Sequence, residues 1–118
     1  MPRFLTMVRV DERNAPTEAP DPGFDARMGA LFEEITKAGV MLETAALTPT
    51  SEGTRITWSD GKLSYTDGPF TESKEVIGGY SLTRCEDKAE ALEWAKRFLE
   101  VHPANWTVTV EVREIAEG

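Results

Sequence analysis

An Asp-Gly-Pro-Phe segment lies near the middle of the chain, at residues 67–70. Asp67 is a carboxylate that could act as a general base or accept a hydrogen bond from a ligand. The same segment suits a tight turn, because Pro69 fixes its own φ and an aspartate can accept hydrogen bonds from the amides of its turn. We expect Asp67 to serve both as a turn residue and as a residue of a binding site.

A glycine pair, Gly78 and Gly79, follows this segment and precedes Tyr80. Paired glycines inside a strand indicate a bulge or a close approach of another backbone. They could equally leave space over the sheet beside Asp67, into which Tyr80 would present its hydroxyl. The sequence leaves both alternatives open.

Three further side chains complete the candidate site. His102, the single histidine of the chain, follows a predicted helix. It is therefore expected either to cap that helix or to act as the proton partner of Asp67. Arg9 and Arg113 lie in predicted strands and could bind an anionic group of a ligand. The candidate catalytic residues are thus Asp67 and His102, and the candidate ligand-binding residues are Arg9, Tyr80 and Arg113.

The composition limits the classes of partner. The chain has 118 residues, which we read as one domain spanning 1–118, and a net charge of -8. Such a surface repels the phosphates of nucleic acids and anionic lipids, so we expect no nucleic-acid and no membrane partner. We find no signal peptide or membrane-spanning run and expect a cytoplasmic protein. One cysteine, Cys85, and one histidine make neither a disulfide nor a metal cluster, and no cofactor motif is present.

The elements that must position these residues follow from the hydrophobic periodicity. Asp21 is the predicted N-cap of a first helix, which should stop near Gly39. Asp87 is the predicted N-cap of a second helix, which should end before Pro103. Asp60-Gly61 predicts a two-residue hairpin turn. The predicted strands span 4–10, 40–47, 54–58, 62–65, 76–84 and 106–113. This order predicts an α+β sandwich of ferredoxin type, with an antiparallel sheet, two helices on one face and an inserted β-hairpin.

The second face of the sheet needs a cover that the helices do not supply. The strand at 4–10 is apolar on both sides, through Phe4 and Val8 on one and Leu5 and Met7 on the other. An exposed apolar sheet face is rare in monomers, so we predict a second copy packed sheet against sheet. In the last strand, the residues on the side away from the valines either face water or line a cavity, and Arg9 and Glu43 could join them. These residues are Thr107, Thr109, Glu111 and Arg113.

The central motif resembles that of the YciI-related family, also called the DGPF-domain family. The resemblance rests on Asp67-Gly68-Pro69-Phe70, the charged run at 71–75, Gly78-Gly79-Tyr80 and the segments 91–95 and 111–113. It implies a ferredoxin-like protomer in a dimeric α+β barrel, with Asp67 in a cleft. The YciI branch has a His-Asp pair with a histidine near the first strand, whereas here His102 follows the second helix.

Two functions stay open on this basis. The first is a cofactor-independent lyase or isomerase acting on a small molecule, with Asp67 as base, Tyr80 or His102 as proton partner and Arg9 or Arg113 as anion binder. The second is a non-catalytic ligand-binding or regulatory homodimer. Since members of the resembling family often accompany sigma-factor genes, such a dimer would act in transcription through protein contacts.

Overall fold

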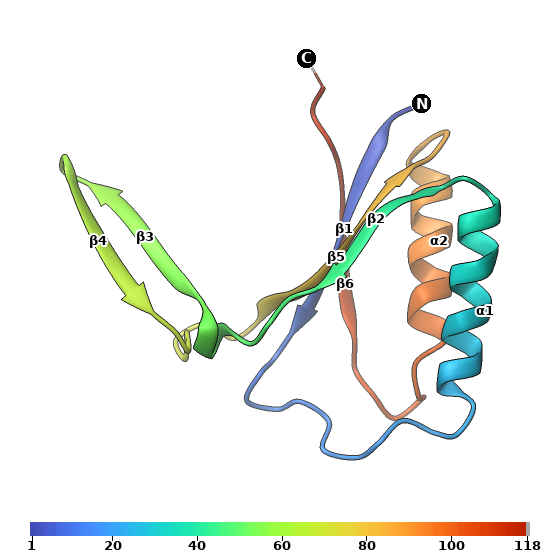
Figure 1. Cartoon of the computed structure of the whole chain (residues 1–118), viewed down its shortest axis with the longest axis horizontal. Helices are drawn as coiled ribbons and strands as arrows, with labels where there is room; N and C mark the ends of the chain where they lie inside the picture. Colours follow the sequence, from blue (N-terminus) through green and yellow to red (C-terminus); the bar gives the residue numbers. More distant parts are fainter. Residues whose placement is uncertain (118) are drawn as a thin grey trace.

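Four antiparallel strands form the main sheet in the order β2-β5-β1-β6, and a separate two-stranded hairpin, β3–β4, extends from it (Figure 1). The computed structural model describes residues 1–117. Its elements are β1 (Arg3–Val10), α1 (Phe24–Lys37), β2 (Met41–Ala46), the 3-10 turn η1 (Thr50–Glu52), β3 (Thr54–Ser59), β4 (Lys62–Asp67), β5 (Val76–Arg84), α2 (Lys88–Glu100) and β6 (Thr109–Glu114).

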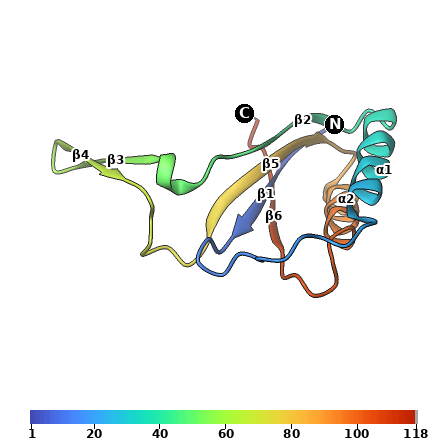
Figure 2. The same ribbon diagram turned by 60° about the horizontal axis from the view of Figure 1, so that its bottom comes forward.

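Both helices lie against the same face of the main sheet (Figure 2). Between these layers lies the core of buried residues, Phe4, Ile35, Val40, Cys85 and Ala91. Burial raises the pKa of the Cys85 thiol, which packs as a small apolar side chain. The predicted α+β fold of ferredoxin type, with two helices on one face and an inserted hairpin, is confirmed.

The helix starts were predicted with mixed success. Asp87 caps α2, since its side chain accepts a hydrogen bond from the Glu90 amide at 2.9 Å. The prediction that Asp21 caps α1 is wrong, because the N-cap is Gly23. The Asp21 carboxylate accepts two hydrogen bonds from Arg27, at 2.7 and 2.8 Å, and one from the Gly23 amide at 3.1 Å. Arg27 also donates to the Val101 carbonyl at the end of α2, so Asp21 helps to tie the two helices together.

The last strand is shorter than the pattern predicted. β6 begins at Thr109, and Trp106 lies in a turn in which its amide donates to the Pro103 carbonyl at 3.0 Å. The Trp106 ring lies 6.1 Å from that of Phe24 and 6.3 Å from that of His102. This aromatic cluster holds Trp106 beside the helix ends, so the alternation at 106–108 does not become strand.

The hairpin β3–β4, which we call the arm (residues 54–67), reaches away from both layers (Figure 1). Its tip is Asp60-Gly61, with φ of 52° and 73°, the positive values that an Asp-Gly hairpin turn requires. The molecule therefore measures 47 × 43 × 18 Å, which is long and broad but thin.

Two short segments, 47–53 and 68–75, join the arm to the sheet, and we call them the hinge. They are held together where the Gly68 amide donates to the Gly53 carbonyl at 2.9 Å, next to the cis Gly68–Pro69 bond. A Cβ placed on Gly68 would lie 1.6 Å from the Thr50 carbonyl oxygen. Only glycine fits at this position of the Asp-Gly-Pro-Phe motif, because the two hinge segments touch there through their backbones.

We expect Gly68→Ala to destabilise the protein by about 1–3 kcal/mol, as for other forced overpacking. The matched control is Gly29→Ala in α1, where an added Cβ meets nothing within 4 Å. Replacing a helical glycine there should stabilise by up to about 1 kcal/mol. Thermal and urea unfolding of both variants measure the effect, and unchanged stability of Gly68→Ala would contradict the backbone contact.

Candidate functional site

The face of the sheet that the helices leave bare, which we call the open face, carries three of the five predicted site residues. Phe4 is buried under the helices, so alternation along β1 turns Leu5, Met7 and Arg9 to the other side. The register places residues opposite these on the same face. The open face therefore consists of Leu5, Met7, Arg9, Glu43, Ala45, Ile77, Tyr80, Leu82, Thr109, Glu111 and Arg113.

The glycine pair makes a bulge on this sheet. Val8 pairs with Gly79 and Arg9 with Ile77, which leaves Gly78 as the extra residue in β5. A Cβ on Gly79 would lie 3.0 Å from the Ala45 carbonyl oxygen of β2. The bulge that was one of the two alternatives is thus present, and it allows the close approach of β2.

Arg9 is the best placed cation of the open face. Its Nη1 donates to Glu111 Oε1 at 3.1 Å, while its Nε lies 3.6 Å from Glu75 Oε2, too far for a hydrogen bond. Among the residues that the structure describes, this buried Nε has no hydrogen-bond partner. A guanidinium group whose N–H donors are not all in use can donate hydrogen bonds to a further anionic partner.

A hollow of about 520 Å³ lies beside Arg9, between the sheet and the base of the arm, and we call it the hinge hollow. This volume is within the range of small-molecule sites. The sheet contributes Arg9 and Ile77 to its walls, and Glu75 precedes β5. From the arm and hinge come Thr50, Arg55 and Phe70, together with Leu47, Thr48, Pro49, Gly53 and Val76 around them.

Phe70, the last residue of the motif, forms part of this hollow. The Arg55 guanidinium lies 3.8 Å from the centre of the Phe70 ring, a cation–π contact that orients both side chains. Arg55 also pairs with Glu72 and donates to Ser73 Oγ at 2.9 Å. Sequence reasoning missed Arg55 and Glu75, because a charge in a solvated strand or loop carries no signal of the hollow that the hinge creates.

Asp67 has a structural contact, but with a hydroxyl of the neighbouring strand and not, as was expected, with the amides of its turn. It is the last residue of β4, and its Oδ1 accepts a hydrogen bond from Thr54 Oγ1 at 2.9 Å across the base of the arm. It is not among the residues that line the hinge hollow. The motif thus shapes the hollow through Gly68 and Phe70, while the Asp67 side chain ties β4 to β3.

Tyr80 and Arg113 both lie on the open face. A hydrogen bond with the Glu43 carboxylate, helped by partial desolvation, raises the pKa of Tyr80. The side chain of Arg113 is 72% exposed, with its Nε 4.0 Å from Glu111 Oε2. Arg9, Glu111 and Arg113 therefore form a row of alternating charge along the sheet.

His102 lies at the end of α2, where its Nδ1 is 3.0 Å from the Phe98 carbonyl and 3.3 Å from that of Leu99. Its ring packs edge-on against Phe98 at 4.9 Å and near Phe24 at 5.4 Å. These are the contacts of a helix-capping residue. The arm that holds Asp67 and the helix that precedes His102 lie on opposite sides of the sheet (Figure 1), so one copy of the chain does not bring the two together.

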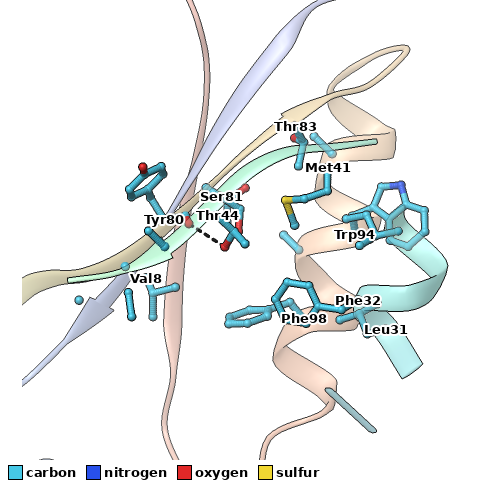
Figure 3. Close-up of a pocket in the computed structure, with 18 of the residues that line it drawn as sticks. Val8, Leu31, Phe32, Met41, Thr44, Tyr80, Ser81, Thr83, Trp94 and Phe98 are labelled. Atoms are coloured by element: carbon cyan, nitrogen blue, oxygen red, sulfur yellow. Dashed lines mark hydrogen bonds between the residues drawn. The ribbon is translucent and has the colours of Figure 1, made fainter. Parts of the chain in front are cut away.

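A second hollow, of about 410 Å³, lies between the sheet and the helices (Figure 3). Apolar side chains such as Met41, Trp94 and Phe98 form its walls, and no charged residue lines it. Thr44 Oγ1 donates to the Tyr80 carbonyl at 3.0 Å and lies 3.1 Å from Ser81 Oγ, while the Tyr80 ring points away from this space. This cavity could hold an apolar group, but it offers no charged partner for chemistry.

Within residues 1–117, no group of three His, Cys, Asp or Glu side chains could hold a metal ion. None of the helices in that part of the chain is both long and apolar enough to cross a membrane.

The fold and the site define a ferredoxin-like α+β protein with a charged open sheet face and a hollow at the base of an arm. A family model described as the YCII-related domain matches residues 4–117. An uncharacterised protein of Rhizobium meliloti (strain 1021) is 33% identical over 89 residues, which cover 75% of this chain and 70% of that protein. The chain belongs to the YCII-related family, and the predicted family is confirmed.

The hinge should be sensitive to acid through Glu12. This side chain accepts hydrogen bonds from the Thr50 amide, at 2.9 Å, and the Thr50 hydroxyl, which lower the pKa of Glu12 below its ordinary value of 4.5. Because the pKa of Glu12 is lower in the folded state, its ionised carboxylate stabilises the fold above pH 4.5. This stabilisation is lost as the pH falls through the folded-state pKa and the carboxylate is protonated. We expect Glu12→Gln to flatten the fall of melting temperature between pH 6 and 3, whereas Glu18→Gln, in the same loop, should leave it unchanged. Equal slopes for all three proteins would contradict this.

A double-mutant cycle tests whether Asp67 and His102 meet. For separate sites, the stability changes of Asp67→Asn and His102→Ala should add within about 0.5 kcal/mol. We expect additivity, with most of the loss coming from His102→Ala because it removes a helix cap and an aromatic contact. A coupling above about 1 kcal/mol would show that the two side chains interact, for example between two copies.

Proposed function

We propose that this protein binds a small organic monocarboxylate in the hinge hollow and works as a homodimer. The observation that carries the proposal is Arg9, whose guanidinium has a buried Nε without a hydrogen-bond partner in the described chain and lines a hollow of about 520 Å³. A guanidinium binds a carboxylate through two parallel hydrogen bonds. Arg9 is therefore the residue that would bind the ligand.

The charges around the hollow disfavour a multiply charged ligand. Its lining holds two arginines, Arg9 and Arg55, and one glutamate, Glu75. Outside the lining, Glu111 pairs with Arg9 and Glu72 with Arg55, so carboxylates already offset both guanidinium charges. A monocarboxylate on the remaining donors of Arg9 therefore meets less repulsion than a phosphate dianion would. Phe70, stacked against Arg55, gives the rest of the ligand a flat apolar wall, which suits an aromatic or aliphatic body.

Binding is favoured over acid–base catalysis by the state of the candidate proton carriers. Asp67 is bonded to Thr54, and His102 to the end of its helix. The raised pKa of Tyr80 moves its hydroxyl further from neutrality, where a general acid or base works best. A cofactor-independent lyase or isomerase would need one of these groups, so we place the non-catalytic ligand-binding role first.

The homodimer is supported by the open face. Leu5, Met7 and Leu82 are half-buried there, although neither helix lies on that side of the sheet (Figure 2). A second copy facing the first would remove these side chains from water.

A ligand panel tests the proposed function. The purified protein is titrated with aromatic and aliphatic monocarboxylates, each beside its primary amide as a neutral control, by thermal shift and calorimetry. We expect carboxylates but not amides to bind, and Arg9→Gln to weaken binding roughly tenfold or more, as for a lost charge-assisted hydrogen bond. Arg13→Gln removes the same charge from the exposed loop and should bind normally. Failure of every carboxylate, or equal binding by Arg9→Gln, would refute the proposal.

A further inference from the structure

The arm has one apolar and one polar face. Residues paired across a hairpin share a face, and the arm pairs Ile56 with Tyr65 and Trp58 with Leu63. These four side chains form what we call the apolar ladder. The pairs between and beyond them, Arg55–Thr66, Thr57–Ser64 and Ser59–Lys62, place only polar side chains on the other face.

The apolar ladder is uncovered in a single copy. Ile56 is 60% exposed, Trp58 69%, Leu63 56% and Tyr65 65%. A two-stranded hairpin without further packing is at best marginally stable in water. Monomers rarely expose adjacent large apolar side chains in this way, and such a patch indicates a contact surface.

The chain cannot cover the ladder as it is folded. The arm points away from the sheet and from both helices, and the two views agree on this (Figures 1 and 2). The hinge that directs the arm outward is fixed by the backbone contact between Gly68 and Thr50. One chain therefore keeps two apolar surfaces apart, the ladder and the open face.

We propose that the arm of each copy packs its apolar ladder on the open face of a second copy. This inference rests on the proposed homodimer and adds the element that holds it. In a two-fold dimer, each ladder would meet the partner's Leu5, Met7 and Leu82, so one contact made twice covers both surfaces.

The area is sufficient for a stable dimer. Large aromatic side chains bury about 150–250 Å² each, so four large side chains more than half exposed present roughly 500 Å² per arm. Two arms and the matching surface on the two sheets then bury about 2,000 Å², the upper end of the standard range for specific protein interfaces. Covering the ladders alone with a foreign protein would leave both open faces in water.

The packing also places Asp67 in the proposed contact between the arm and the partner. Thr54 and Asp67 pair at the base of the arm and lie on the same face as the ladder, because they stand two positions before Ile56 and two after Tyr65. An arm laid on the partner therefore turns the Asp67 carboxylate toward the partner's open face, which carries the exposed Arg113.

Sedimentation over a dilution series tests the role of the ladder. The double variant Trp58→Ser/Leu63→Ser should dissociate at concentrations roughly 100-fold higher than the unmodified protein, as for the loss of interface anchors. The matched control Thr57→Ala/Ser64→Ala alters the polar face and should dissociate like the unmodified protein. Circular dichroism should show all of them folded. An unmodified protein that is monomeric would overturn the dimer and the docking together, whereas a dimer unaffected by the ladder variant would overturn the docking alone.

Disulfide cross-linking identifies the surface on which the arm lies. Trp58→Cys protein is mixed with tagged Met7→Cys protein, and Phe32→Cys on α1 serves as the control partner. Cys85 can remain because it is fully buried. We expect a linked pair of Trp58→Cys and Met7→Cys chains. The double variant Trp58→Cys/Met7→Cys reports links within one chain. If it links only within one chain, or if Trp58→Cys links only to Phe32→Cys, the proposal is overturned, because the arm would then cover its own sheet or a helix.

Discussion

Two helices bury one face of a four-stranded sheet, and neither helix covers the other face. The rest of the molecule follows from this constraint. Leu5 and Met7 sit half-buried beside Arg9 and Glu111 because each strand must alternate between a helix-covered face and an open face. The same bare face is where the proposed ligand would approach Arg9, and where the proposed second copy would find apolar surface.

The hinge and the sheet together form the walls of the hinge hollow. Thr50 is bonded to Glu12 from the long loop after β1, and its hydroxyl accepts a hydrogen bond from the Phe70 amide at 3.3 Å. With Gly68 pressed against the same residue, three segments distant in the chain meet at one turn. In the Asp-Gly-Pro-Phe motif, Gly68 therefore allows the close backbone contact with Thr50, while Phe70 forms part of the wall of the hinge hollow.

Much of this architecture could be predicted from local pattern. The alternation in β1, the Asp60-Gly61 turn and the Asp87 cap follow from periods and propensities that act over a few residues. The errors arose where tertiary contacts prevail. Asp21 pairs with Arg27 while Gly23 takes the N-cap position, and the rings of Phe24 and His102 pack beside Trp106 away from the sheet. The hinge hollow was not predicted either, because Arg9 and Arg55 come together only once the backbone has turned back at Gly68. For the same reason, the pattern at 54–65 predicted a hairpin without indicating that its apolar face would point into open water.

Ligand binding and dimer contact are coupled if both proposals hold. The hinge hollow has one wall on the sheet, at Arg9 and Ile77, and the other on the base of the arm, at Arg55 and Phe70. A carboxylate seated between them would fix the arm relative to its own sheet, and therefore relative to the partner on which the ladder lies. If the ligand stabilises the packed position of the arm by some free energy, it strengthens the dimer by that amount. By linkage, formation of the dimer then strengthens ligand binding by the same amount. An overall charge of -8 opposes the approach of two copies, and a bound carboxylate adds a negative charge, which does not reduce that repulsion. The coupling must therefore come from the position of the arm, that is, from the stiffness that Gly68, Thr50 and Glu12 give to the hinge.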